Sequence, residues 1–268
     1  MELFDIVALA IIQGITEFLP ISSSGHLALW PLLTGRADQG VVMDVAVHVG
    51  TLVAVCLYFR AEIGQLFIGV GHVLAGQTKT EPARLVWLLI IATIPVILFG
   101  LGLKLSDSQA AFRSVEAIGW ATVIGAALLW IADRTVPNRG VAETWTRRDA
   151  VLMGVAQALA LIPGASRSGL TMTMGRWLGF DRTQAARLAM LMAVPTIIGA
   201  GTVETLGVVR DGNLELGAEL LLGASLSCIA ALIALTLMMR MFAGSWTMLW
   251  FVLYRLALGG FLLWIAYF

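Results

Sequence analysis

The sequence predicts an all-helical integral membrane protein with six full transmembrane helices and two re-entrant helical hairpins, arranged as an inverted-topology repeat. Three observations lead to this prediction. Hydrophobic residues make up 59% of the 268 residues and charged residues only 13%, whereas a soluble domain carries about 25% charged residues. Six apolar runs are long enough to cross a bilayer. Two further apolar stretches are broken by polar residues, and they resemble each other.

The six apolar runs each reach the length of roughly 17–25 residues that a spanning helix needs. We expect one span in each of residues 41–59, 85–104, 115–132, 185–208, 216–240 and 247–267, within a single membrane domain over residues 1–268. The formal net charge is zero, so nothing points to nucleic acid. Cys56 and Cys228 lie inside apolar runs, where they resemble small core residues and not a disulfide framework or metal site.

The two broken stretches, residues 3–33 and 150–178, are too interrupted to face lipid as single helices. Non-helical backbone is tolerated at membrane depth only where protein buries it or water reaches it. We therefore expect each stretch to form two half-helices joined by a polar turn. The interruptions are Gln13, Glu17, Pro20, Ser22, Ser23, Ser24 and Gly25 in the first stretch, and Gln157, Pro163, Gly164, Ser166, Arg167, Ser168 and Gly169 in the second.

The broken stretches align with each other, with short insertions. Gly14-Ile-Thr-Glu17-Phe-Leu19 matches Gly154-Val-Ala-Gln157-Ala-Leu159, and Pro20-Ile-Ser-Ser-Ser-Gly25 matches Pro163-Gly-Ala-Ser-Arg-Ser-Gly169. Each is followed by three spans, so residues 1–132 and 150–268 read as two repeats. An odd number of crossings per repeat inverts one repeat relative to the other. Broken segments at matching positions of inverted repeats point to a binding site near the membrane midplane.

The distribution of basic residues predicts the orientation. Cytoplasmic loops carry an excess of Lys and Arg, and eleven basic residues fall on one predicted side against four on the other. Both termini and the opening of the first hairpin are then outside, and the second hairpin enters from the cytoplasm. The first side holds Arg60, Lys79, Arg84, Arg134, Arg139, Arg147, Arg148, Arg176, Arg182, Arg187 and Arg240, and the second holds Arg36, Lys104, Arg113 and Arg210.

The first broken stretch contains the groups best suited to acid–base chemistry. Gln13 and Glu17 are four residues apart and share a helix face, where they could hold a hard cation, or a water and a proton; the alternative is a polar pair that joins two helices. The hydroxyls of Ser22, Ser23 and Ser24 at a helix start form an anion site or supply a nucleophile, unless they only cap the helix. His26 is a candidate acid or base, or a packed histidine.

The second stretch places a guanidinium at membrane depth, where it needs an anionic partner. Arg167 lies between Ser166 and Ser168, and Thr171 adds a hydroxyl nearby. A planar bidentate donor suits phosphate; the alternative is a structural ion pair with Glu17.

Two further groups are interpreted as structural. His48 and Asp44, four residues apart, are expected to satisfy each other, and Arg255 to pair with Glu204 or Asp44.

If the inverted repeats pack face to face, Glu17, the serines, His26 and Arg167 converge near the midplane. The set then contains a nucleophile, a base, a carboxylate for a divalent metal and a phosphate clamp. The reaction class implied is phosphoryl transfer to water, in which positioning and charge stabilisation carry the catalysis.

The two motifs also resemble those of a known family. Gln13-x-x-x-Glu17-Phe-Leu-Pro-Ile-Ser-Ser-Ser-Gly-His26 and Pro163-Gly-Ala-Ser-Arg-Ser-Gly-x-Thr171 are similar to the signature motifs of the BacA-type undecaprenyl pyrophosphate phosphatases. The resemblance implies a multi-pass enzyme of the bacterial cytoplasmic (inner) membrane that hydrolyses undecaprenyl pyrophosphate to undecaprenyl phosphate. This recycles the lipid carrier for wall polymers and gives bacitracin resistance. It also implies a divalent cation, Mg²⁺ or Ca²⁺, and an active site open to the periplasmic face.

The resemblance assigns roles to the candidate residues. Glu17 becomes a catalytic carboxylate and, with the neutral Gln13, the metal ligand. Ser23 fits the proposed nucleophile, although attack by a His26-activated water stays open, and Arg167 fits the pyrophosphate clamp. The remaining substrate-binding candidates are Ser22, Ser24, Ser166, Ser168 and Thr171.

The expected partners are the polyprenyl pyrophosphate substrate and the lipid bilayer, with a homodimer left open. Two other functions compete with the enzyme. Paired broken hairpins in inverted repeats are also transporter architecture, so a lipid-phosphate flippase is the first rival. The second is a binding or scaffold membrane protein whose polar residues only lock helices together.

Overall fold

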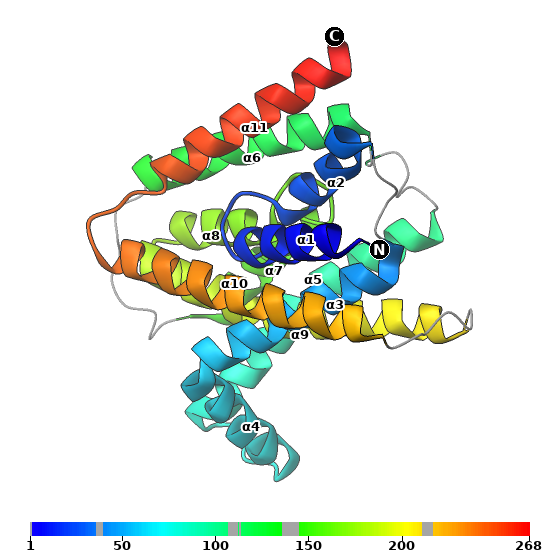
Figure 1. Cartoon of the computed structure of the whole chain (residues 1–268). Helices are drawn as coiled ribbons and strands as arrows, with labels where there is room; N and C mark the ends of the chain where they lie inside the picture. Colours follow the sequence, from blue (N-terminus) through cyan, green and yellow to red (C-terminus); the bar gives the residue numbers. More distant parts are fainter. Residues whose placement is uncertain (1, 36–39, 107–111, 113, 136–144, 211–216) are drawn as a thin grey trace.

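The computed structural model describes residues 2–35, 40–106, 112, 114–135, 145–210 and 217–268, and its regular structure there is helical throughout (Figure 1). Six of the described helices are long and apolar enough to cross a membrane, namely α3, α5, α6, α9, α10 and α11. This confirms a multi-pass, all-helical membrane protein. The helices are α1 (Leu3–Thr16), α2 (Ser23–Thr34), α3 (Gly40–Tyr58), α4 (Arg60–Leu74), α5 (Glu81–Leu105), α6 (Val115–Thr135), α7 (Arg147–Leu159), α8 (Arg167–Trp177), α9 (Arg182–Arg210), α10 (Ala218–Ala243) and α11 (Leu249–Tyr267).

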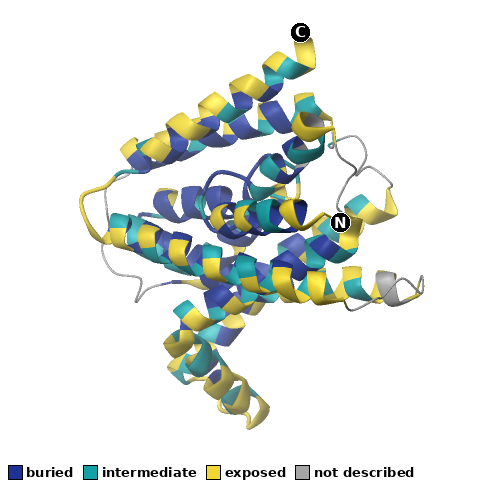
Figure 2. Cartoon of the chain, viewed as in Figure 1, coloured by how far each residue is buried: buried dark blue, intermediate teal, exposed yellow. Residues whose placement is uncertain are grey.

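The long helices lie where the apolar runs predicted them, with small differences at the ends. The fifth predicted span began at Leu216, which lies outside the described residues, as do Arg36, Arg113 and Arg139. Helix α4 was not predicted; it projects from the bundle beyond α3 (Figure 1). Figure 2 shows why the spans could be predicted from the sequence. Buried residues gather at the centre of the molecule, and the long helices turn exposed faces outward.

Each broken stretch forms two short helices joined by a tight turn, α1 with α2 and α7 with α8. The break has the same cause in both. Ser22 and Ser166 adopt left-handed backbone conformations, with φ of 74° and 69°, which a helix cannot continue through. The side chain of each then caps the second helix, because Ser22 Oγ accepts from the Gly25 amide at 3.3 Å and Ser166 Oγ from the Gly169 amide at 3.1 Å.

The two short-helix pairs also pack in matching ways. Gly14 of α1 lies against Ala230 and Ala231 of α10, and its aligned partner Gly154 of α7 lies against Ala92 of α5. Both contacts are so close that no side chain fits between the helices. The α10 helix is the second span of its half after the turn, as α5 is of the first, so each short helix pairs with the corresponding helix of the other half.

Other helices surround α9 on several sides. Helix α9 contacts α3, α5, α8 and α10, and residues 188–193 near its start are almost completely buried in the largest apolar cluster. Helices α6 and α11 run side by side along the other edge of the molecule (Figure 1). The hairpin helices α1, α2, α7 and α8 fill the space between these layers, so their turns lie in the interior.

Polar contacts gather several helix ends into one cluster. The end of α6 meets the start of α9 through Asp133 and Arg182 at 2.7 Å, and the start of α4 meets α9 through Glu62 and Arg187 at 3.0 Å. Arg84 at the start of α5 donates to the carbonyl of Trp145, just before α7, at 3.1 Å. These are ends that the sequence placed on one side of the membrane.

A second cluster of helix ends is joined by aromatic and apolar contacts. The rings of Phe4 near the start of α1 and Trp30 near the end of α2 lie 5.9 Å apart. At the other helix pair, the indole of Trp120 in α6 donates to the hydroxyl of Tyr267 at the end of α11 at 3.2 Å. Leu29, Ile118 and Leu262 join these helices into one apolar cluster.

The contact at Gly154 predicts a stability effect. A Cβ there would collide with the Ala92 carbonyl, so Gly154→Ala should push α7 away from α5 and cost about 1–3 kcal/mol, which lowers Tm by several degrees. Thermal unfolding of the purified protein in detergent measures this. The matched control is Gly199→Ala, because a Cβ at Gly199 meets open space. Equal Tm values for the two variants would show that the α5–α7 contact is looser than described.

Candidate active site

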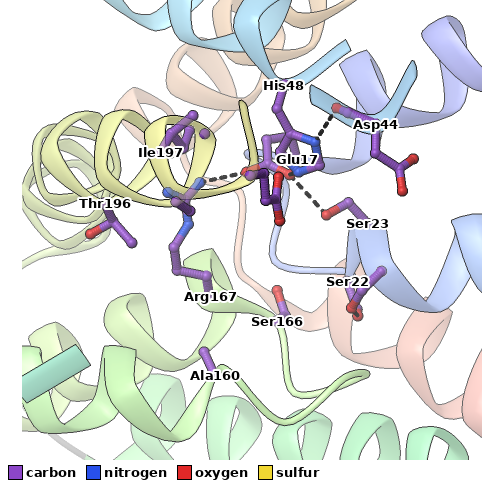
Figure 3. A pocket seen from close by; sticks show the side chains of 14 residues that line it. Glu17, Ser22, Ser23, Asp44, His48, Ala160, Ser166, Arg167, Thr196 and Ile197 are labelled. Atoms are coloured by element: carbon purple, nitrogen blue, oxygen red, sulfur yellow. Dashed lines mark hydrogen bonds and ion pairs between the residues drawn. The ribbon is translucent and has the colours of Figure 1, made fainter. Parts of the chain in front are cut away.

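The two interior turns meet at a polar pocket of about 260 Å³. Its residues come from both short-helix pairs and from the two spans α3 and α9, so the site exists only when the two halves pack together. Figure 3 shows Arg167 from one side and Ser23 from the other, both directed at Glu17. The lining residues are Glu17, Ser22, Ser23, Ser24, Asp44, His48, Ala160, Ser166, Arg167, Thr196, Ile197, Ala200, Gly201 and Glu204.

The Glu17 carboxylate is the centre of the site. It is nearly buried, and its Oε1 accepts from Arg167 Nη2 at 2.7 Å. Its Oε2 accepts from Ser23 Oγ and from Gln13 Nε2, each at 2.8 Å. The structure thus brings Glu17, Ser23 and Arg167 together from segments about 150 residues apart in the chain. Arg167 therefore forms the ion pair with Glu17 that was predicted as the alternative to phosphate binding.

Ser23 and Arg167 occupy equivalent positions in the two halves. Each directly follows the capping serine and is the first residue of its helix, α2 or α8. Their neighbours Ser24 and Ser168 are equivalent too, and each reaches the opposite turn: the Gly164 amide donates to Ser24 Oγ at 3.3 Å, and Ser168 Oγ donates to the Leu19 carbonyl at 2.8 Å. These cross-contacts fix the spacing between the two turns.

The remaining phosphate-binding candidates divide into two groups. Ser22, Ser24 and Ser166 line the pocket, although Ser22 and Ser166 use their hydroxyls as helix caps. Thr171 does not line it; its hydroxyl donates to carbonyls of its own helix. Ser168 is likewise absent from the lining. Substrate contact by these last two residues stays a prediction.

His26 lies one turn away from the pocket lining. Its Nδ1 donates to the Ser22 carbonyl at 2.7 Å, and its Nε2 lies 2.6 Å from the Tyr254 hydroxyl. The two rings stack with a centroid distance of 5.6 Å. The structure does not bring His26 into contact with Ser23 or Glu17, so its role as acid or base stays a prediction.

A different histidine faces Glu17. His48 Nε2 lies 3.7 Å from Glu17 Oε2, and its Nδ1 donates to the backbone carbonyl of Asp44 at 2.7 Å. The expected contact between His48 and Asp44 forms through the Asp44 backbone carbonyl, and the other ring nitrogen of His48 is directed at Glu17. Sequence reasoning also missed Glu204, which lines the same pocket. The available signal was the rarity of His, Asp and Glu inside apolar spans, where such residues face a cavity.

Arg255 was misinterpreted. It is fully buried, and its guanidinium donates to backbone carbonyls instead of to Glu204 or Asp44. Carbonyl oxygens at the turns are free because no helix uses them, so one planar donor can collect several. The acceptors belong to both interior turns and to α6: Pro20 at 3.4 Å, Gly164 at 3.3 Å, Ala165 at 2.9 Å and Thr122 at 3.3 Å.

The charges of the pocket bear on metal binding. Three carboxylates, from Glu17, Asp44 and Glu204, line it with a single guanidinium, that of Arg167. Within the described part of the chain, no group of three or more His, Cys, Asp or Glu side chains could hold a metal ion by itself. Gln13 donates from Nε2 to Glu17, and its Oε1 is buried without a hydrogen-bond partner, so Oε1 would reach a cation at Glu17 only if the amide turned over. A carboxylate and an unpaired amide oxygen suit a hard cation that takes its other ligands from water and substrate.

Comparison with known proteins identifies the family. The family described as "Bacitracin resistance protein BacA" matches residues 6–261 of the chain. The chain belongs to the BacA family. Its similar relatives include proteins named undecaprenyl-diphosphatase from Dinoroseobacter shibae and a Jannaschia species, each 49% identical over 268 residues and covering 100% of both chains. A third, from Alteromonas mediterranea with the same name, is 45% identical over the full length of both chains.

The Glu17–Arg167 pair predicts a coupled stability effect. Removing one partner of a buried ion pair leaves an uncompensated charge and costs about 3–5 kcal/mol. Glu17→Gln and Arg167→Met should therefore each lower the thermal stability in detergent, while the double variant should lose much less than the sum of the two. Strictly additive losses would contradict a direct interaction between these side chains.

Proposed function

We propose that this chain hydrolyses undecaprenyl diphosphate to undecaprenyl phosphate and inorganic phosphate. The reaction returns the lipid carrier to wall-polymer synthesis and, by depleting the diphosphate, gives bacitracin resistance. The observation that carries the proposal is the junction of Ser23, Glu17 and Arg167 in one interior pocket. It combines a hydroxyl, a carboxylate that accepts its proton and a cation suited to phosphate. Family membership and the name of the relatives support the same reaction.

The acidic lining supports a divalent cation, Mg²⁺ or Ca²⁺, as the cofactor. A diphosphate is a polyanion, and Arg167 alone cannot offset it in a pocket that also contains Glu17, Asp44 and Glu204. When bound, the ion would neutralise charge on the diphosphate. Glu17 and, with its amide turned over, the unpaired Oε1 of Gln13 would hold it. The guanidinium of Arg167 would hold the transferring phosphoryl group, in exchange for part of its contact with Glu17.

The geometry favours attack by Ser23. Its Oγ already donates to Glu17 Oε2, so the carboxylate can accept the proton as Oγ bonds to the terminal phosphorus. The bond between that phosphorus and the bridging oxygen breaks, and undecaprenyl phosphate leaves. Water then attacks the phosphoserine and releases inorganic phosphate, which restores the Ser23 hydroxyl. Direct attack by water needs no Ser23 hydroxyl and would survive Ser23→Ala.

We further propose that the two short-helix pairs are re-entrant hairpins of inverted halves. The polar cluster of helix ends collects Arg182, Arg187 and Arg84, which supports this cluster as the cytoplasmic side of a bacterial inner membrane. The aromatic cluster at Phe4, Trp30 and Tyr267 would then lie at the periplasmic side. Its position beside both chain ends agrees with termini and an active site that face outward.

Phosphate release tests the proposed enzyme. Purified protein with undecaprenyl diphosphate and Mg²⁺ should release phosphate, and EDTA should abolish this. Arg167→Lys keeps the charge but loses the bidentate geometry, so kcat should fall by about 10²-fold or more. Arg187→Lys changes a comparable ion pair outside the pocket, with Glu62, and should keep near-normal activity. Absence of release by folded wild-type protein would favour the flippase, which a liposome assay of lipid transport would then detect.

The orientation predicts the outcome of reporter fusions. Alkaline phosphatase fused after Phe268 should be active, because that enzyme folds only in the oxidising periplasm. A fusion in the segment after α4, at Gln77, should be inactive, since that segment lies on the proposed cytoplasmic side. The reverse pattern, with equal expression of both fusions, would invert the proposed orientation.

A further inference from the structure

The polar pocket has an apolar continuation. A groove of about 340 Å³ lies between α3 and α9, and it shares His48, Ile197 and Gly201 with the pocket. Beyond these three residues its lining is nearly all apolar. The other residues are Val45, Val49, Leu52, Ile198, Thr202, Thr205 and Leu206.

The groove is open toward the lipid. Val49 is 45% exposed, Ile198 51% and Leu206 64%. On each helix the lining residues recur at helical spacing, which makes a continuous strip along the two helices. Thr202 turns its hydroxyl back to the Ile198 carbonyl at 2.7 Å, so it presents its methyl group outward. A chain lying in this strip would contact apolar atoms on one side and bilayer on the other.

We infer that the polyprenyl tail of the substrate leaves the polar pocket past Gly201 and lies in the α3–α9 groove. This inference rests on the proposed function, since it takes a lipid diphosphate as the ligand. The substrate has a polar head joined directly to an apolar chain, so its binding site must pass from polar to apolar without a break. The shared residues provide that passage.

A larger apolar groove lies elsewhere but does not meet this requirement. It has a volume of about 530 Å³, and its lining comes from α1, α10 and α11. None of its lining residues lines the polar pocket. Ile11 and Ile15 of α1 and Leu19 just after it face this larger groove, whereas Gln13 and Glu17 contact each other on another face of the same segment. A head group at Glu17 would therefore lie across α1 from a tail in the larger groove.

Gly201 controls the passage because it has no side chain. It lines both cavities, and a Cβ built there meets no atom within 4 Å. Its position is thus open space at the point where the head pocket becomes the tail groove. A Cβ at this position is free of protein contacts, so a larger side chain would extend into the passage, and replacing a helical glycine favours the helix. The residue is accordingly a determinant of chain-length specificity.

The decisive experiment compares Gly201→Leu with wild type on a long and a short substrate. A leucine side chain there should keep at least two CH₂ groups of the tail out of the groove, so kcat/KM for undecaprenyl diphosphate should fall at least about tenfold more than kcat/KM for isopentenyl diphosphate. The short substrate has a chain of few carbons, so its loss reports any effect of the variant on the head pocket. Gly199→Leu is the matched control on the same helix, since its position is also open and lines neither cavity. Ile233→Trp blocks the larger groove and should leave both rates near normal.

Two results would overturn the inference. If Gly201→Leu lowers kcat/KM equally for both substrates, its effect lies in the head pocket. If Ile233→Trp, and not Gly201→Leu, lowers kcat/KM for the long substrate, the tail lies in the larger groove.

A prenyl diphosphate with a benzophenone on its chain gives a readout that needs no turnover. It should label residues 45–52 or 198–206, and excess undecaprenyl diphosphate should suppress the labelling. Labelling that competitor does not suppress would identify the groove as a site for bilayer lipid.

If wild type releases phosphate from neither substrate yet shows the competed labelling, the proposed hydrolysis fails and the tail site stands. If wild type is active but the α3–α9 groove is not labelled, the tail site fails and the hydrolysis stands. The two ideas are therefore separable with the same protein preparation.

Discussion

The structure depends on one buried carboxylate. Glu17 lies inside a protein whose surroundings are apolar, where an unpaired charge would convert to a neutral form or unfold the site. It is held by Arg167 on one oxygen and by Ser23 and Gln13 on the other. Because Arg167 comes from the opposite half of the chain, satisfying Glu17 requires both halves to pack with their turns together. The same contact that stabilises the fold assembles the pocket.

A second buried charge supports the first. Within the described residues, Arg255 contacts no carboxylate and is satisfied by carbonyls of both turns. These carbonyls are free because residues 17–22 and 160–166, between the paired helices, are not helical, and each non-helical segment ends at a serine with a left-handed backbone conformation. The break at each turn thus has two consequences: it supplies acceptors for Arg255 and it starts a new helix whose first residue points at Glu17. Polar contacts determine how the interior segments of this membrane protein are arranged, and the apolar helices around them separate these contacts from the lipid.

The sequence predicted the parts of this arrangement that follow from local pattern. The spans could be predicted because their outward faces are apolar over the full bilayer thickness. The turns at Ser22 and Ser166 could be predicted because serine, proline and glycine break helices. Contacts between segments that are distant in the chain were harder to predict. His48 was paired with Asp44 because they are neighbours on one helix, yet its free nitrogen faces Glu17. Arg255 was predicted to pair with a carboxylate. Its acceptors are carbonyls of two turns that lie far apart in the chain, and no sequence pattern indicates such a contact. Helix α4 was missed because it is largely exposed and carries charged and glycine residues along an apolar stretch too short to span.

The aligned halves explain how one pocket acquires opposite charges. Ser23 and Arg167 hold the same position at the start of α2 and α8, and both contact Glu17, one on each oxygen. The position equivalent to Glu17 in the second half is Gln157, which is buried and uncharged, with both amide atoms lacking a hydrogen-bond partner in the described structure. Two copies of the first half would bring two carboxylates together, two copies of the second half would bring two guanidinium groups together, and both arrangements repel. Divergence at these two pairs of positions instead places a single carboxylate between one hydroxyl and one guanidinium, so the charges in the contact are balanced.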